Sequence, residues 1–237
     1  QGGHHTPTIT PIFKHSNIDI STVKVLPTRS QLVAALTGGG IGIYDLVTSD
    51  MVMSYEGWIP ARVTALDTNG DESLLFIGYS TSAIVIFDLE TGEPKQLEAV
   101  SDSGMPVTSI SVSPDGDKFT AVCGKEFAVW NLPSWTMSHS HRTIWHTFDK
   151  IAFTADSKKL HVASYMDIGE YNLEDGKYNV LYSFTTEADA IHLSSDGATV
   201  VVHERYSGDF QIITVQTGDT TQTITVSNAD DCRAKLS

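Results

Sequence analysis

Three histidines stand close together in the stretch "SHSHRTIWHTF" at 138–148. On an extended strand the His-x-His pair would point both imidazoles to one side, because side chains alternate along a strand. Imidazole nitrogens are frequent ligands of zinc and iron, so the candidate metal ligands are His139, His141 and His146. No carboxylate or cysteine stands at a spacing that would complete such a site. We therefore expect a loop with exposed or hydrogen-bonded histidines rather than a bound metal.

Other catalytic or ligand-binding signatures are incomplete. "GYSTS" at 78–82 lacks the second glycine of a nucleophile elbow. "DTNGDESLLFIG" at 67–78 begins like a calcium loop, but Glu72 and Gly78 occupy the positions where that loop needs a glycine and a glutamate. A hairpin turn explains this stretch better. The sequence therefore predicts neither an enzyme nor a cofactor.

Charge and composition exclude further classes. The chain has 29 acidic and 15 basic residues and a net charge of −14, which disfavours nucleic acid as the main partner. No apolar run approaches the roughly 20 residues that cross a membrane, so no membrane partner is expected. Cys123 and Cys232 form no metal knuckle or disulfide framework, and no N-glycosylation sequon is present. These features favour an intracellular location, in the cytoplasm or nucleus.

A repeated motif indicates which strands and turns must position these residues. A short motif occurs as "IGIYDL" at 41–46, "IVIFDL" at 84–89, "FAVWNL" at 127–132 and "IGEYNL" at 168–173, with a weaker "FQIITV" at 210–215. Its aromatic position (Tyr44, Phe87, Trp130, Tyr171, then Ile213) recurs after 43, 43, 41 and 42 residues. Alternating apolar segments and Asn-Gly or Asp-Gly turns fill the rest of each period. A period of about 40–45 residues is typical of a four-stranded propeller blade.

The predicted fold is therefore all-β, a β-propeller of four-stranded antiparallel blades forming a single domain over 1–237. Five complete repeats of about 42 residues are expected at 15–57, 58–100, 101–140, 141–184 and 185–226. The four repeated aromatic side chains should lie buried between neighbouring blades. "TITPIFK" at 8–14 and "DCRAKLS" at 231–237 read as partial end strands. We expect the missing strands of that blade to come from further sequence or from another chain by β-augmentation.

The motif ending in aromatic-[DN]-L, the "SPDG" turn at 113–116 and the period together resemble the WD40-repeat family over residues 8–237. That family usually carries a Gly-His pair before each first strand and a buried Asp–His–Ser/Thr–Trp network. Here only "FKHSN", with His15, is similar, and blade four has "IWHTFDK" instead. The resemblance implies a non-catalytic protein-interaction scaffold within a larger complex. The alternative is a propeller enzyme or a small-molecule or metal binder using the central channel, which would need converging His, Asp or Glu side chains.

Asp45 and Asp88 recur at one place of the repeat and are replaced by Asn131 and Asn172 in later copies, which indicates a structural hydrogen bond rather than catalysis. In propellers of this kind, the loops after the second and fourth strands share one face. Trp, Tyr and Arg are enriched at binding hot spots, so this face is the candidate partner-binding surface. Its candidate residues are Trp58, Arg62, Tyr79, Arg142, Trp145, His146, Tyr165, Met166, Arg205 and Tyr206.

Overall fold

The computed structural model describes residues 19–57, 59–97, 100–101, 103–184, 188–205, 209–215 and 218–224. These residues form five four-stranded sheets, blades 1 to 5, each an antiparallel meander. Blades 1 to 3 contain β1 (Ile20–Leu26), β2 (Gln31–Leu36), β3 (Ile41–Asp45) and β4 (Met51–Tyr55); β5 (Val63–Thr68), β6 (Leu74–Tyr79), β7 (Ile84–Asp88) and β8 (Pro94–Leu97); and β9 (Val107–Val112), β10 (Lys118–Cys123), β11 (Glu126–Asn131) and β12 (Thr136–Arg142). Blades 4 and 5 contain β13 (Phe148–Phe153), β14 (Lys159–Ser164), β15 (Asp167–Asn172) and β16 (Tyr178–Ser183); and β17 (Ala188–Leu193), β18 (Thr199–Glu204), β19 (Phe210–Thr214) and β20 (Thr220–Ile224).

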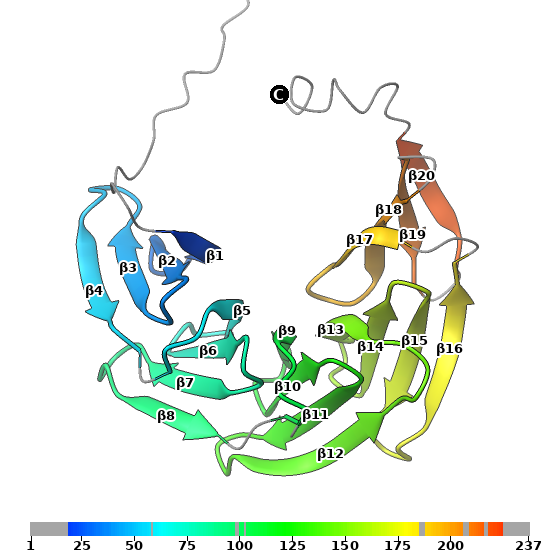
Figure 1. Ribbon diagram of the computed structural model, residues 1–237, viewed down its shortest axis with the longest axis horizontal. Helices are drawn as coiled ribbons and strands as arrows, with labels where there is room; N and C mark the ends of the chain where they lie inside the picture. Colours follow the sequence, from blue (N-terminus) through cyan, green and yellow to red (C-terminus); the bar gives the residue numbers. More distant parts are fainter. Residues whose placement is uncertain are drawn as a thin grey trace, which may run out of the picture.

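The blades follow one another around an arc (Figure 1). The first strand of each blade lies innermost and the fourth strand lies on the outer rim. The arc is open between blade 1 and blade 5, which stand at its two ends. The all-β propeller prediction is therefore confirmed. The described part of the chain contains no helix, and so none that is long and apolar enough to cross a membrane.

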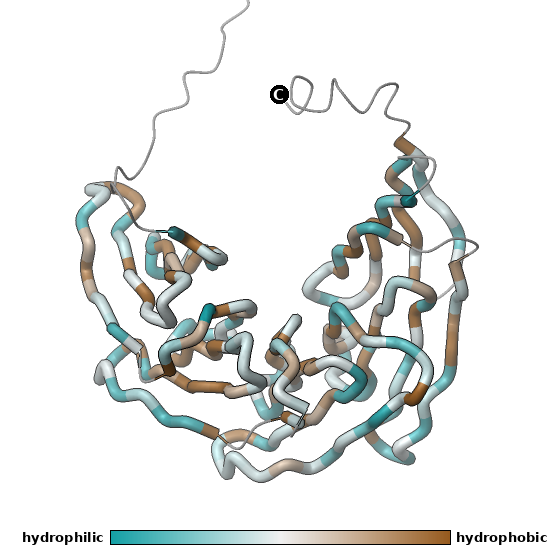
Figure 2. Tube along the Cα trace, viewed as in Figure 1, coloured by the Kyte–Doolittle hydropathy of each residue, from teal (hydrophilic) through white to brown (hydrophobic). Residues whose placement is uncertain are grey.

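The hydrophobic core is divided among the seams between blades. Apolar residues are spread over all five blades rather than gathered in one place (Figure 2). Phe87, Trp130 and Tyr171 are buried in clusters that join each blade to the one before it, as predicted. Tyr44 is buried too, but it belongs to none of the seam clusters between described blades, and its ring lies over Gly42 of its own blade. A four-stranded blade alone would leave both faces exposed, so each blade is stabilised by its neighbours.

The repeated acids hold the turns between third and fourth strands. Asp45 Oδ1 accepts hydrogen bonds from the backbone N–H groups of Val47 and Thr48, each at 2.8 Å. Asp88 Oδ1 accepts the same pair of bonds, also at 2.8 Å, from Glu90 and Thr91. These backbone donors, Thr48 foremost for Asp45 and Thr91 for Asp88, lower the pKa of both carboxyl groups. The structural interpretation of these acids is confirmed. The end segments 8–14 and 231–237 lie outside the described residues.

Candidate functional site

Two large apolar side chains are exposed on the loop that joins blade 3 to blade 4. Ile144 is 75% exposed and Trp145 is 80% exposed. The loop backbone is nevertheless tied down, because Lys125 Nζ donates to the Ile144 carbonyl at 3.1 Å and the Trp145 N–H donates to Thr143 Oγ1 at 3.3 Å. Thr143 N–H in turn bonds the Lys125 carbonyl at 3.0 Å. The loop therefore presents its apolar side chains from a defined backbone.

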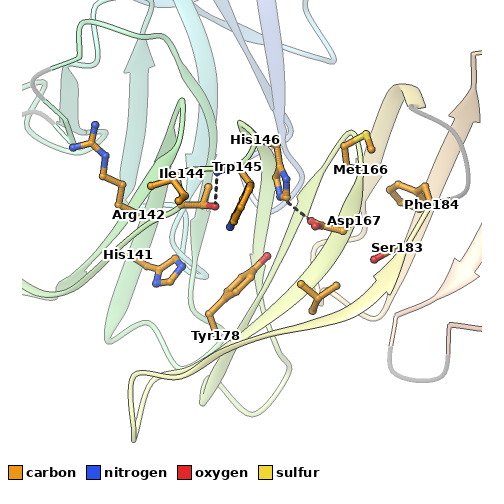
Figure 3. A pocket seen from close by; sticks show the side chains of 12 residues that line it. His141, Arg142, Ile144, Trp145, His146, Met166, Asp167, Tyr178, Ser183 and Phe184 are labelled. Carbon is orange, nitrogen blue, oxygen red and sulfur yellow. Dashed lines mark hydrogen bonds and ion pairs between the residues drawn. The ribbon is translucent and has the colours of Figure 1, made fainter.

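This loop forms one wall of a surface pocket of about 650 Å³, here called the blade 3–4 groove. Figure 3 shows Ile144 and Trp145 on one side, Met166 and Phe184 on the other, and Tyr178 between them at the base. Elements β12, β15 and β16 complete its walls. The lining residues are His141, Arg142, Thr143, Ile144, Trp145, His146, Met166, Asp167, Tyr178, Val180, Ser183 and Phe184.

The base of the groove is an aromatic pair. His141 stacks on Tyr178 with ring centroids 4.9 Å apart and an interplanar angle of 20°. Tyr178 can lie this deep only because Gly169 of β15 has no side chain, since a Cβ there would be 2.0 Å from the Tyr178 hydroxyl oxygen. Burial raises the pKa of Tyr178, with a smaller contribution from the Asp167 charge, and burial lowers the pKa of His141. Both shifts favour the uncharged forms, so neither ring brings a charge to the base of the groove.

A buried polar network fixes the far wall. Asp167 Oδ1 lies 3.1 Å from His146 Nε2 and accepts a hydrogen bond from Ser164 Oγ at 2.9 Å. The backbone N–H groups of Met166 and Asp167 donate to Ser164 Oγ at 3.1 and 3.0 Å. The serine hydroxyl contacts the carboxylate rather than the imidazole, so the three side chains do not have the order of a Ser–His–Asp triad. The network instead joins the turn between β14 and β15 to the loop before β13.

The sequence did not predict this network, because the residue before His146 is not the glycine of the Gly-His pair that marks such a network in WD40 repeats. The usable signal was the stretch "SYMD" at 164–167, which places a serine at the end of one strand and an acid at the start of the next. Neither residue is unusual alone. Asp167 contacts His146 only because the turn between β14 and β15 folds next to the loop before β13. His146 is therefore a structural wall of the groove as well as one of its predicted surface residues.

The groove brings together Arg142, Trp145, His146 and Met166 from the predicted partner-binding surface. Arg142 is exposed and its Nε lies 3.2 Å from Glu126 Oε1. Tyr165 precedes the groove residue Met166 but points elsewhere, donating its hydroxyl hydrogen to Asp149 Oδ1 at 3.2 Å. These predicted groove residues come from the end of β12, the loop before β13 and the turn between β14 and β15.

Tyr79 departs from the sequence expectation. Its side chain is fully buried at the seam between blades 1 and 2, and its hydroxyl donates to the Gly39 carbonyl at 3.2 Å. It ends β6 on the face that packs against blade 1, so it holds two blades together instead of meeting a partner. Arg62 is exposed but lies apart from the groove, and Arg205 Nε pairs with Asp189 Oδ1 at 2.6 Å in blade 5. Trp58 and Tyr206 lie outside the described residues.

The histidine cluster has ordinary packing contacts. His139 lies with Nδ1 3.0 Å from Ser138 Oγ and meets Tyr171 edge-on, with centroids 6.2 Å apart. His141 and His146 are engaged in the groove as described above. Across the described residues, no group of three or more His, Cys, Asp or Glu side chains is placed to hold a metal ion.

A second pocket of about 350 Å³ lies along the innermost strands, where the channel alternative would place its site. Among its described lining residues Asp67 is the one carboxylate, and there is no histidine. Asp67 Oδ1 is 2.7 Å from Lys24 Nζ, and its Oδ2 accepts the Val112 N–H at 3.0 Å. Because both oxygens already bond to groups of neighbouring blades, this carboxylate links blades 1, 2 and 3.

No protein-family model matches the chain, and a search of curated proteins gives no match. The features that bear on function are the five-bladed arc and the apolar groove between blades 3 and 4.

Proposed function

We propose that this chain is a non-catalytic protein-interaction scaffold that binds a partner protein through the blade 3–4 groove. The observation that carries the proposal is Trp145, an indole 80% exposed beside a pocket rather than inside a core. Exposing so large an apolar side chain has no benefit for folding, whereas tryptophan is the residue type most enriched at binding hot spots.

The shape of the groove supports recognition of an apolar side chain of the partner. Ile144 and Trp145 stand opposite Met166 and Phe184 across the His141–Tyr178 base, and Val180 also lines the groove, so an inserted aliphatic or aromatic group would be partly removed from water. The loop and the opposite wall are already held by hydrogen bonds, so little conformational entropy is lost on binding. Arg142 at the margin supplies a polar rim.

The Ser164–Asp167–His146 network supports a WD40-like assignment of the scaffold. Its aspartate, histidine and serine are three of the four residue types of the Asp–His–Ser/Thr–Trp network that the WD40 resemblance implies. The repeated aromatic position of blade 4 holds Tyr171. Such scaffolds present loops from a rigid ring of blades. The proposed partner is therefore a protein, and the site is a loop-bearing groove rather than a reaction centre.

A peptide-display selection tests the proposal. A phage-displayed peptide library would be selected on the purified chain, and the selected peptides titrated against wild type, Trp145→Ala and Val47→Ala. Val47 is an exposed apolar residue in a turn of blade 1 and serves as the matched control. Trp145→Ala should weaken binding by about 1–2 kcal/mol or more, with thermal stability nearly unchanged. Peptides that bind Trp145→Ala as tightly as wild type would refute the groove as the binding site.

A further inference from the structure

The two ends of the arc leave apolar positions more exposed than most of their equivalents at the seams inside it. One such position is the start of the first strand, where the residue pairs with the last residue of the second strand: Ile20, Val63, Val107, Phe148 and Ala188. In blades 2 to 5 this residue is buried against the preceding blade. Ile20 of blade 1 is 51% exposed. The residue type is apolar in all five blades, but in blade 1 nothing among the described residues covers it.

A second position in the same strands repeats the contrast. In each blade this residue pairs with the residue two before the end of the second strand: Val23, Leu66, Ile110, Ile151 and Ile191. The three isoleucines are buried and Leu66 is half-buried, whereas Val23 is 53% exposed. Val25, two residues further along β1, is also exposed. These side chains belong to the side of blade 1 that faces away from blade 2, here called the leading face.

The opposite end of the arc shows the complementary surface. In blade 2, Phe76 and its cross-strand neighbour Ile86 are buried against blade 3. The equivalent pair in blade 5 is Val201 and Ile212, and both are only half-buried. Phe210 of the same strand is half-buried too. They define the trailing face of blade 5, the side that faces away from blade 4.

We propose that these two faces are docking surfaces for further four-stranded β-blades, which pack between blade 5 and blade 1 and close the ring. At every internal seam, the trailing face of one blade packs against the leading face of the next blade. The two open faces at the ends of the arc are one of each kind. The occupant must therefore be a blade with apolar side chains on both of its faces. Removing these aliphatic side chains from water provides the driving force. This inference is independent of the blade 3–4 groove.

Lengthened chains with thiol reporters test the proposal. Copies of residues 59–100 (one blade) or 59–142 (two blades) would be joined after Ile224. The trailing face of blade 5 would then meet the leading face of a blade 2 copy, the same face that packs against blade 1 in the chain itself. Reporters would be Val23→Cys and Ile212→Cys, measured one at a time, with Cys232→Ser in the 237-residue chain and serine in place of the second copy of Cys123 in the two-blade chain; Cys123 itself is fully buried. Val47→Cys, in an exposed turn away from both faces, is the control.

In the chain whose length closes the ring, both reporter thiols should react about tenfold more slowly with a thiol reagent than in the 237-residue chain, because thiol reactivity follows exposure. The Val47→Cys thiol should react at the same rate in all chains. If a reporter disturbs folding, as judged by circular dichroism, Val25→Cys or Val201→Cys replaces it. Unchanged reporter rates in both lengthened chains would overturn the proposal. So would concentration-dependent protection in the unlengthened chain, which would assign the faces to a second copy.

Discussion

Replacing Trp130 with alanine tests the assignment of the seams as the core of this protein. The side chain is 2% exposed and stacks on Phe119, with centroids 4.7 Å apart and planes 7° from parallel. A buried tryptophan covers on the order of 200 Å², which at about 25 cal/mol per Å² corresponds to about 5 kcal/mol. Measured large-to-small truncations in cores cost about 3–5 kcal/mol, so we expect Trp130→Ala to lower the free energy of unfolding by that amount.

Trp145→Ala is the matched control, because it deletes the same side chain from a position that is 80% exposed. It should change the free energy of unfolding by about 0.5 kcal/mol or less. Urea unfolding followed by far-ultraviolet circular dichroism measures both variants without relying on tryptophan fluorescence. Because neighbouring blades can unfold separately, amide exchange in β10 and β11 should locate the loss in blade 3. Equal destabilisation by the two variants would refute the division into buried seam and exposed groove.

Two further predictions concern the groove base and the turns. Gly169→Ala should lower the free energy of unfolding by about 1–3 kcal/mol, because its Cβ would overlap the Tyr178 hydroxyl. Gly70→Ala, with no atom near the added Cβ, should be nearly neutral in the same thermal melts. Equal effects of the two substitutions would contradict the packing of Tyr178 over Gly169. Backbone donors depress the folded-state pKa of Asp45 and Asp88, so their contribution is present above the unfolded pKa of about 3.9 and is lost as pH falls below it. The double variant Asp45→Asn/Asp88→Asn keeps an acceptor oxygen and should lose less of its urea midpoint between pH 7 and pH 3 than wild type does. An identical acid loss in both proteins would show that these carboxyl groups are not responsible.

The fold could be predicted from the sequence because its determinants are local and repeated. Alternation with period two, Asn-Gly and Asp-Gly turns, and a regular aromatic position define each blade without reference to any other. The burial of Phe87, Trp130 and Tyr171 followed from the same regularity. Where a residue type recurs at one place of every repeat, its environment recurs as well, so Asp45 and Asp88 could be recognised as turn acids before their hydrogen bonds were seen.

The site depended on contacts between segments far apart in the chain, which a repeat pattern does not specify. Tyr79 and Trp145 are both aromatic residues near strand ends, yet one is sealed by blade 1 and the other stands in solvent. His146 meets Asp167 only because two loops of blade 4 converge. The exposure of Val23, at a position that is buried in blades 3 to 5, depends on the open arc, because no described blade precedes blade 1. Local sequence determines the strands and turns of each blade, but the surface available for binding depends on which blades lie against one another.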